Sequence, residues 1–511
     1  MESITRRTFL KASLSASTIA MAPLGSFAAG NKTDLSGRDN VIIIYADDLG
    51  YGDLGCYGAE HIPTPHCDRL AREGMRFTDA HSPSAVCTPS RYATLTGRYA
   101  WRTWLQNWVL QEHMPLLIEP DRLTIPKMMQ EHGYRTCCIG KWHLGWGNDI
   151  NPDFGKDISP GPLEVGFDEF FGVPFSHNSS LKLQNFVRDR RLVGLSEEDD
   201  LEDERVQKRL ARRLEDTAIE LSNEAVRFIR NNKDNPFFLY YPTTNVHSPV
   251  TPNERFQGTS DVGKYGEYVV EFDWAVGEIL RTLDELELTE RTLLIVTSDN
   301  GGRPHAWRLM GTEKHNINGS LRGMKRQIWE GGHRVPMLVR WPGTVSAGSV
   351  CNETICHTDL MTTLAACLGY ALPENAAEDS YNIMPLLLGQ EQQQPIREAT
   401  VHHSVNGMFA IRKGPWKLIE GDTDGDFRRG HNAQEKSRNL PERNPATGKF
   451  EPFYYDILDY DKDNPVYQLY NLDKDPGELK NVAADHPDKV AELKALLNRY
   501  RSSGRSTPVP R

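Results

Sequence analysis

Four short apolar runs in this sequence are each followed, within a few residues, by polar side chains that suit catalysis. These side chains are Asp47, Asp48, Lys141, His143, His247, Asp299 and Asn300. Because ligands bind at the carboxyl ends of the strands in open α/β sheets, we expect these residues to share one rim of a sheet. The aspartates and the asparagine offer only hard oxygen ligands, which suit Ca²⁺ or Mg²⁺ better than zinc. The sequence therefore predicts an oxygen-ligated divalent metal site.

Three cations accompany this set, and on the same rim they would surround an anion. They are Arg91, Lys141 and Lys325. Positioned cations beside a divalent ion suit a tetrahedral oxyanion such as a sulfate or phosphate ester. His143 and His247 can act as acid or base, since the unperturbed pKa of histidine lies near neutrality. Taken singly, such residues are more often caps, turns or surface charges, so the prediction depends on their shared placement after strands.

The elements that must position these residues alternate between strands and helices. Strands are expected at 41–45, 134–139, 236–242, 292–298 and 335–342, where apolar runs are short and continuous. A helix is expected within 123–133, where Thr124 can cap the start and Gly133 lies just past the end. A second helix is expected at 264–287, which has apolar residues at helical spacing. This alternation predicts an α/β sandwich around a mostly parallel central sheet.

The pattern changes beyond about residue 395. The stretch 408–421 predicts a hairpin, and the residues that follow predict a small antiparallel sheet closed by one helix. Two segments, 175–213 and 421–452, are long, charged and weakly periodic, and we expect them to be either functional rims or mobile surface. The predicted organisation is a catalytic domain at 35–395 and a C-terminal subdomain at 396–511.

The N-terminus resembles a twin-arginine export signal. Arg6 and Arg7 precede a mildly apolar stretch that ends in small residues, with cleavage expected near Ala28 or Ala29. The alternative is an ordinary disordered basic terminus. No other run approaches the ~18 apolar residues of a membrane span. We therefore expect residues 1–30 to be a signal, and the mature protein to be soluble and located in the periplasm or secreted.

Composition and cysteine usage restrict the other classes of function. The chain has 511 residues and a formal net charge of −11, which disfavours nucleic acid or an anionic membrane as a general partner. Its 8 cysteines form no C-x-x-C pair and no zinc-ligand pattern, so a disulfide framework is not expected. Whether Cys351 and Cys356 pair in an oxidising compartment stays open.

The stretch "CTPSRYATLTGR", which begins at Cys87, resembles the signature of the type I sulfatases. The resemblance extends over "YADDLGYGDLGCYG", "GKWHLG", "PFFLYYPTTNVHSP", "TSDNGG", "LRGMKRQIWEGGHRVP" and "LYNLDKDPGELKNVA", and so covers nearly all of the mature chain. It implies an alkaline-phosphatase-like sandwich. It also implies that a maturation enzyme, either formylglycine-generating or an anaerobic sulfatase-maturating type, reads the C-x-P-x-R motif and oxidises Cys87 to Cα-formylglycine.

The resemblance also implies a role for each matched residue. The implied ligands of one Ca²⁺ are Asp47, Asp48, Asp299 and Asn300, together with the oxidised residue 87. Arg91 would steady the modified residue, and Lys141 and Lys325 would bind the sulfate. His143 would lie beside the formylglycine hydrate, and His247 would contact the substrate and protonate the leaving oxygen. The hydrate has two hydroxyls on one carbon, so one can attack sulfur and the other can later expel sulfate.

The whole pattern is similar to the bacterial sulfatases that act on glycans, including N-acetylgalactosamine-6-sulfatase relatives, so the expected substrate is a sulfated carbohydrate. Four tryptophans could stack on sugar faces or belong to the core, namely Trp101, Trp104, Trp108 and Trp146. Two other functions stay open. One is a phosphate or phosphonate ester hydrolase of the same superfold, and the other is a glycan-binding relative without catalysis. Cys67 and His333 depart from the family pattern at positions that are commonly apolar.

Overall fold

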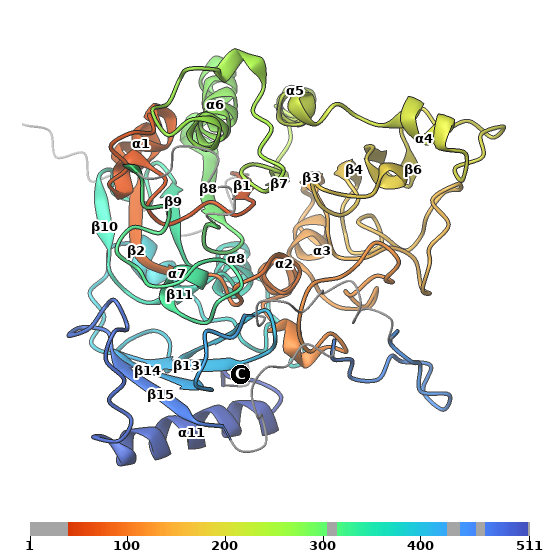
Figure 1. Cartoon of the computed structure of the whole chain (residues 1–511). Coiled ribbons are helices and arrows are strands. Elements are labelled where there is room, and N and C mark those ends of the chain that lie inside the picture. The colour runs from red at the N-terminus through yellow and green to blue at the C-terminus, as the bar shows by residue number, and fades with distance from the viewer. Residues whose placement is uncertain (1–38, 304–313, 427–439, 456–464, 509–511) are drawn as a thin grey trace, which may run out of the picture.

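A computed structural model describes residues 39–303, 314–426, 440–455 and 465–508 (Figure 1). The predicted export signal at 1–30 lies outside these residues. Within the described ranges, no helix is long and apolar enough to cross a membrane.

The described residues form one 11-stranded sheet and one 4-stranded sheet. The strands of the large sheet are β1 (Asn40–Ala46), β2 (Met75–His81), β3 (Arg135–Lys141), β4 (Glu169–Val173), β5 (Val187–Arg188), β6 (Arg191–Leu192), β7 (Phe237–Pro242), β8 (Thr292–Ser298), β9 (Arg334–Arg340), β10 (Ser349–Cys351) and β11 (Ile355–Cys356). Their spatial order is β10-β2-β9-β8-β1-β7-β3-β4-β5-β6, with β11 also paired to β2. The central strands β8, β1, β7, β3 and β4 are parallel, so the mostly parallel sheet is confirmed.

The order of the chain explains why the predicted rim exists. Strands β1, β3, β7 and β8 run in one direction at the centre of the sheet, so their carboxyl ends lie at the same edge. The strand predicted at 335–342 is β9, but it runs antiparallel to both of its neighbours, β2 and β8. Its carboxyl end therefore lies away from the rim, and its preceding loop reaches the rim instead.

Helices cover both faces of the large sheet. Those on one face are α1 (Pro65–Glu73), α5 (Thr217–Asn231) and α6 (Lys264–Glu285), and those on the other are α2 (Cys87–Thr96), α3 (Ile125–Glu131) and α8 (Asp359–Leu368). The described residues also contain the shorter helices α4 (Glu204–Leu210), α7 (Glu330–His333) and α9 (Met384–Leu387). The predicted start of α3 is confirmed, because the Thr124 side chain accepts a hydrogen bond from the Lys127 amide. The helix predicted at 264–287 is α6.

Strand β1 shows how two cores arise from one sheet. Its successive side chains point to opposite faces, and all seven of its residues are buried. Ile42 and Ile44 pack in a cluster with residues of α1, α5 and α6. Ile43 and Tyr45 pack on the other side, with residues of α2, α3 and α8. Burial on both faces explains the continuous apolar sequence of this strand.

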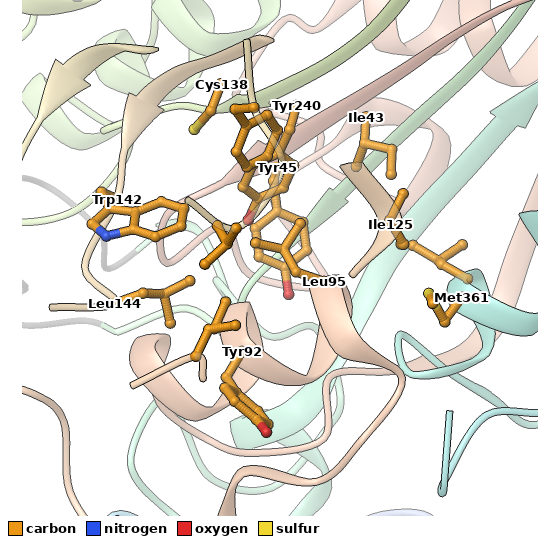
Figure 2. Close-up of a cluster of buried hydrophobic side chains, with 14 of the residues drawn as sticks. Ile43, Tyr45, Tyr92, Leu95, Ile125, Cys138, Trp142, Leu144, Tyr240 and Met361 are labelled. Carbon is orange, nitrogen blue, oxygen red and sulfur yellow. The ribbon is translucent and has the colours of Figure 1, made fainter. Parts of the chain in front are cut away.

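The second of these cores fixes helix α2 against the sheet. Figure 2 shows Tyr92 and Leu95 of this helix in one cluster with Ile43, Tyr45 and Trp142. The hydroxyl of Tyr45 also lies 2.9 Å from that of Thr94, which adds a polar contact between strand and helix. The helix therefore has a fixed position relative to the rim.

The C-terminal part forms the second sheet, as predicted. Its antiparallel strands are β12 (Thr400–His403), β13 (Phe409–Lys413), β14 (Trp416–Glu420) and β15 (Tyr467–Asn471). Helix α11 (Pro487–Ser502) packs against it through Leu493, Leu497 and Tyr500. Figure 1 shows this sheet and helix, in blue, as a separate layer beside the large sheet. Cys351 and Cys356 are both free thiols in the structure.

Candidate active site

Cys87 is the first residue of helix α2, and its side chain is buried. All ten residues of this helix are buried, which is unusual for a helix that carries Thr, Ser and Arg. The amides of the first turn have no partners within the helix, so the helix N-terminus favours negative charge beside residue 87. Residue 87 is therefore held in a position suited to an anionic group.

Arg91 lies one turn further along α2 and joins the helix to two strand ends. Its guanidinium donates to Asp299 Oδ2 at 2.7 and 3.1 Å and to the Lys141 carbonyl at 3.1 Å. It also lies 3.5 Å from Asp47 Oδ1. Since Arg91 is fully buried, these partners are what compensates its charge.

Lys141 is the last residue of β3 and pairs with the acid that follows β1. Its Nζ atom donates to both carboxylate oxygens of Asp47 at 2.9 Å. Both side chains are fully buried.

Lys325 connects the second acid to the cysteine. Its Nζ atom lies 2.6 Å from Asp48 Oδ1 and 3.3 Å from Cys87 Sγ. The Asn300 amide donates to the same Asp48 oxygen at 2.8 Å, and the Asp48 amide donates to Asp299 Oδ1 at 3.1 Å. The residues that follow β1 and β8 are thereby tied to the loop that carries Lys325.

Two histidines border this cluster from other loops. His143 Nε2 lies 3.1 Å from the Leu110 carbonyl, and its Nδ1 atom is buried without a hydrogen-bond partner. His247 Nε2 lies 3.9 Å from Asp48 Oδ2, and its Nδ1 atom lies 2.6 Å from the Ser248 carbonyl. His247 therefore presents Nε2 to the site and is oriented through Nδ1.

Burial and neighbouring charges shift several pKa values in this cluster. Burial raises the pKa of the Cys87 thiol to about 11, although Lys141 and Lys325 act in the opposite direction. Burial alone would raise the pKa of Asp48, but Lys325 and His247 outweigh it and hold that pKa well below its usual range. At neutral pH the site therefore holds a protonated thiol next to an ionised carboxylate.

Both histidines are neutral at pH 7. Burial lowers the pKa of His143 well below its usual value, and Lys141 and Arg91 add to this effect. Burial and the charge of Lys325 lower the pKa of His247 to about 3, against the opposing effect of Asp48. Each ring therefore offers a nitrogen lone pair.

The cluster forms the floor of an open pocket of about 720 Å³. Cys87, His143, His247 and Lys325 line it together with residues of the 175–180 segment. Four residues at or beside the site have the strained positive φ angles that are uncommon outside glycine, namely Asp48, Trp108, His143 and Arg326. Such strain is typical of sites where side chains must be aimed at a ligand.

The site also contains a donor set for a cation. One ligand atom each from Asp47, Asp48, Cys87 and His247 lie within 4.8 Å of one another. Asn300 Oδ1 is buried without a hydrogen-bond partner. Carboxylate oxygens beside an unpartnered amide oxygen fit a hard divalent cation such as Ca²⁺.

Comparison with known proteins identifies the family. The model of the family described as Sulfatase matches residues 39–370, and that described as N-sulphoglucosamine sulphohydrolase, C-terminal, matches residues 323–432. The chain belongs to the sulfatase family. It is a sulfuric ester hydrolase, and the resemblance drawn from the sequence is confirmed.

Several sulfatases are similar over most of their length. N-acetylgalactosamine-6-O-sulfatase of Bacteroides thetaiotaomicron is 35% identical over 91% of this chain and 94% of the relative. Human arylsulfatase A is 34% identical over 89% of this chain and 86% of the relative. A solved structure from the B. thetaiotaomicron core locus for the metabolism of multiple glycosaminoglycans has a TM-score of 0.79 and 34% identity. It is matched over 91% of this chain and 99% of its own.

The structure brings the ten residues predicted for this sulfatase into one region. Asp47, Asp48, Cys87, Arg91, Lys141, His143, His247, Asp299, Asn300 and Lys325 are linked by the contacts above or line the same pocket. The four tryptophans separate into two groups. Trp108 lines the pocket, whereas Trp101 and Trp146 are buried in core clusters and Trp104 packs against one.

The sequence reasoning missed two residues of the site. Thr88 donates to the His143 carbonyl at 3.0 Å and so fixes the loop that carries this histidine. Arg303 lines the pocket beside Lys325. Its position after "DNGG" was the available signal, since it follows β8 as closely as His247 follows β7.

Proposed function

We propose that this sulfatase removes O-sulfate from a sulfated carbohydrate, with residue 87 as Cα-formylglycine and one Ca²⁺ in the site. The observation that carries the proposal is the setting of Cys87. Its Sγ atom lies 3.3 Å from Lys325 Nζ on the floor of the pocket, where three buried carboxylates and three buried cations meet.

The state of the thiol supports conversion of Cys87. A pKa of about 11 leaves almost no thiolate at neutral pH, so the unmodified cysteine is a poor nucleophile. Formylglycine at residue 87 would supply a hydrated aldehyde, which has two hydroxyls on one carbon: one to serve as the nucleophile and one to allow release of sulfate. The helix N-terminus and Lys325 stabilise negative charge at residue 87.

The residues that would hold Ca²⁺ are Asp47, Asp48, Asp299, Asn300 and residue 87. Bound there, the ion would neutralise part of the carboxylate charge and lower the cost of negative charge on the substrate. The unpartnered Asn300 Oδ1 atom and the gathered carboxylates support this assignment. Arg91 holds Asp299 in place through two hydrogen bonds, so its role is to position a ligand and to steady helix α2.

The remaining residues bind the ester and move protons. Lys141 pairs with Asp47, and Lys325 pairs with Asp48. Once a cation binds these two carboxylates, both ammonium groups are placed to bind sulfate oxygens. His247 is placed to protonate the leaving oxygen through Nε2. Burial and Lys325 lower its pKa to about 3. A bound anionic ester opposes Lys325 and raises that pKa, which makes proton donation accessible.

The substrate class follows from the pocket and the relatives. The pocket is open, and its lining combines Trp108 with Gln111, Asn178 and Ser179, which suits a polyhydroxylated ring. A relative that is 35% identical carries the name N-acetylgalactosamine-6-O-sulfatase. We therefore place this chain among the carbohydrate sulfatases, with a 6-O-sulfated N-acetylgalactosamine as the first substrate to test.

The proposal also covers the maturation and export of the protein. Residues 1–30 would direct the folded chain through the twin-arginine system to the periplasm or beyond, after a maturation enzyme has converted Cys87. The catalytic domain would span 35–395, and the C-terminal subdomain 396–511. Cytoplasmic conversion before export is consistent with a signal that carries folded proteins.

The test is sulfate release from a panel of sulfated monosaccharides by protein from its native host. Wild type should release sulfate, and Cys87→Ala should be at least about 10⁴-fold slower, since the nucleophile is lost. Phosphate and phosphonate monoesters form a second arm. Faster turnover of those esters would overturn the assignment in favour of the phosphoester hydrolase, and glycan binding without turnover by converted protein would favour the non-catalytic relative.

A further inference from the structure

Arg303 borders the sulfate site at a fixed place on the rim. It follows β8 by five residues, and the glycines before it are held tightly in the structure. Gly302 exchanges hydrogen bonds with the Asn318 side chain, at 2.8 Å through its amide and 3.1 Å through its carbonyl. A Cβ atom on Gly301 or Gly302 would collide with neighbouring atoms at about 2 Å. The backbone that leads to Arg303 is therefore closely packed and hydrogen-bonded.

Among the described residues, Arg303 lacks the carboxylate partner that the neighbouring Lys325 and Arg326 each have. Lys325 pairs with Asp48 at 2.6 Å, and Arg326 pairs with Asp426 at 2.6 Å. Within the described ranges, Arg303 has neither an ion pair nor a hydrogen bond, although it is half-buried. Burial and the nearby Arg326 lower its pKa to about 10, against the opposing charges of Asp48 and Asp426, so the side chain stays charged at pH 7. An unpaired, partly desolvated guanidinium is costly unless a ligand pairs with it.

The pocket offers a reason for such a cation. Its lining contains three basic side chains, Arg303, Lys325 and Arg326, and one acidic side chain, Glu112. Glu112 is occupied by hydrogen bonds from the amide and hydroxyl of Ser180, both at 2.6 Å. One sulfate ester can occupy the site of Lys325, which leaves Arg303 to meet a different group of the same substrate.

We propose that Arg303 binds a second anionic group of the substrate, either a carboxylate or a further sulfate on or next to the sulfated sugar. This inference rests on the proposed function, because it places the second group relative to the ester at residue 87. A guanidinium has a planar fork of donors that can bind two oxygens of either a carboxylate or a sulfate. The chemistry that the two groups share is therefore a pair of anionic oxygens that accept from one edge of the guanidinium. The substrate class is then a polyanionic glycan rather than a singly charged ester.

The experiment compares the selectivity of matched variants of the full-length protein. The ligands share 6-O-sulfated N-acetylgalactosamine, alone, linked to a uronic acid, linked to the same sugar with its carboxyl reduced to an alcohol, or carrying a second sulfate. Affinities are measured by calorimetry in the Cys87→Ala background, so binding is read without turnover. The ratio of kcat/KM between doubly and singly charged ligands is measured in the converted enzyme.

Arg303→Gln should lower the affinity ratio between doubly and singly charged ligands at least about tenfold, the loss expected for one charge-assisted pair. Arg303→Lys should recover part of the ratio, because the charge remains and the fork is lost. The matched control is Arg205→Gln, at an arginine whose side chain is 91% exposed and pairs only with Asp203 among the described residues. It should leave the ratio as in wild type.

The two sources of the second anion give different results. If Arg303→Gln weakens binding of the uronic acid ligand but not of its carboxyl-reduced form, the second group is the uronic acid carboxylate. If Arg303→Gln weakens binding only of the ligand with a second sulfate, the second group is that sulfate. An equal loss with every ligand, an unchanged ratio, or no measurable binding of any of them would overturn the proposal. Binding selectivity without sulfate release would sustain the Arg303 site while contradicting the proposed function, so the two failures are distinguishable.

Discussion

Two clusters of buried charged side chains stand out in the described part of the chain, and they differ in what they face. The Cys87 cluster surrounds Cys87 with Asp47, Asp48, Asp299, Arg91, Lys141 and Lys325. The His81 cluster lies between the two sheets and contains Asp79, His81, Glu330, His333, His402, Arg412, Lys417 and Glu478. Both balance acids against cations, so buried charge by itself does not identify a catalytic site.

The His81 cluster joins the large sheet to the C-terminal sheet. Lys417 of β14 lies 3.1 Å from Glu330 of α7 and 2.8 Å from Glu478. Arg412 of β13 donates to both oxygens of Asp79 on β2 at 2.8 Å. These ion pairs link the C-terminal sheet to the large sheet and the loop before β9, so the cluster stabilises the contact between the two sheets.

The histidines of the His81 cluster do not form a metal site in this arrangement. The rings of His333 and His402 are stacked at 3.8 Å with an angle of 8° between their planes. Ring nitrogens donate their lone pairs within the ring plane, so two parallel stacked rings cannot direct them at one ion. Possible ligand atoms also lie within 4.8 Å of one another for Asp79, His81 and Glu330. The Cys87 cluster differs because it contains an unpartnered amide oxygen and lies beneath a pocket. Convergence on a pocket, rather than burial of charge, distinguishes the functional cluster.

The largest expected effect on stability belongs to the His81 cluster. Lys417→Met removes the cation that two buried carboxylates share. Among the described residues Glu478 then has no cationic partner, whereas Glu330 keeps Arg412 at 3.4 Å. We expect the free energy of unfolding to fall by about 3–5 kcal/mol, the usual cost of breaking a buried pair. Urea unfolding measures this change. The kcat of the folded protein should stay near that of wild type. A large loss of kcat in fully folded Lys417→Met would show that the cluster does more than stabilise the fold.

The counterpart in the Cys87 cluster is Lys325→Met. This change removes a cation that contacts the reacting region, so we expect kcat/KM to fall about 10²–10³-fold. The loss of unfolding free energy should be smaller than for Lys417→Met, because Asn300 still donates to Asp48. Steady-state kinetics and urea unfolding on the same preparations give both numbers. If the two lysine variants behaved alike, the contrast between the clusters would be wrong.

Removal of Ca²⁺ should affect one cluster only. A chelator should abolish sulfate release and lower the free energy of unfolding by about 2.7 kcal/mol if the ion had been present at 100 times its Kd. Added Ca²⁺ should restore both, as followed by thermal melts and sulfate release. The variant Asn300→Ala should need more Ca²⁺ for the same activity. Insensitivity of wild type to chelation would contradict the assigned metal site.

The smallest expected effect is the acid sensitivity of the His81 cluster. Burial alone would raise the pKa of Asp79, but Arg412 and His81 outweigh it and hold that pKa well below its usual range. A depressed pKa adds stability that is present above the unfolded pKa of ~3.8 and is lost as pH falls through the folded value. Asp79→Asn should therefore flatten the decline below pH ~4 by up to about 1.4 kcal/mol per pH unit.

Unfolding in urea between pH 3 and pH 5 measures this decline. The matched control is Asp261→Asn, whose side chain is 78% exposed. This control should keep the slope of wild type. If the free energy of unfolding fell with pH at the same slope in Asp79→Asn and wild type, Asp79 would not contribute to the acid sensitivity of the cluster.

The two clusters also differ in how far they could be predicted from sequence. The Cys87 cluster was predictable because each member follows a buried strand or lies in a short motif, and parallel strands bring those ends together. The strand at 292–298 was predicted with the same bounds as β8. The contact of Lys325 with Cys87 was not predictable by spacing, since it depends on how the loop before β9 reaches the rim.

The His81 cluster left almost no trace in the sequence. Strand β2 was missed although the alternation in "MRFT" is typical of a strand. Its last residues include the charged Asp79, whose burial depends on partners far along the chain such as Arg412 of β13. His333 was noticed as a departure from the family pattern, but two of its partners, His402 and Lys417, come from β12 and β14, far away in the chain. Contacts between distant segments are set by tertiary packing, which local pattern does not encode.

The most direct test of the central claim is the mass of the peptide that contains residue 87, from protein purified from its native host. Conversion to formylglycine makes this peptide about 18 Da lighter than the cysteine form. The account predicts the lighter peptide, with sulfate release that rises in proportion to the converted fraction. A peptide of unchanged mass in protein that still hydrolyses sulfate esters would contradict it.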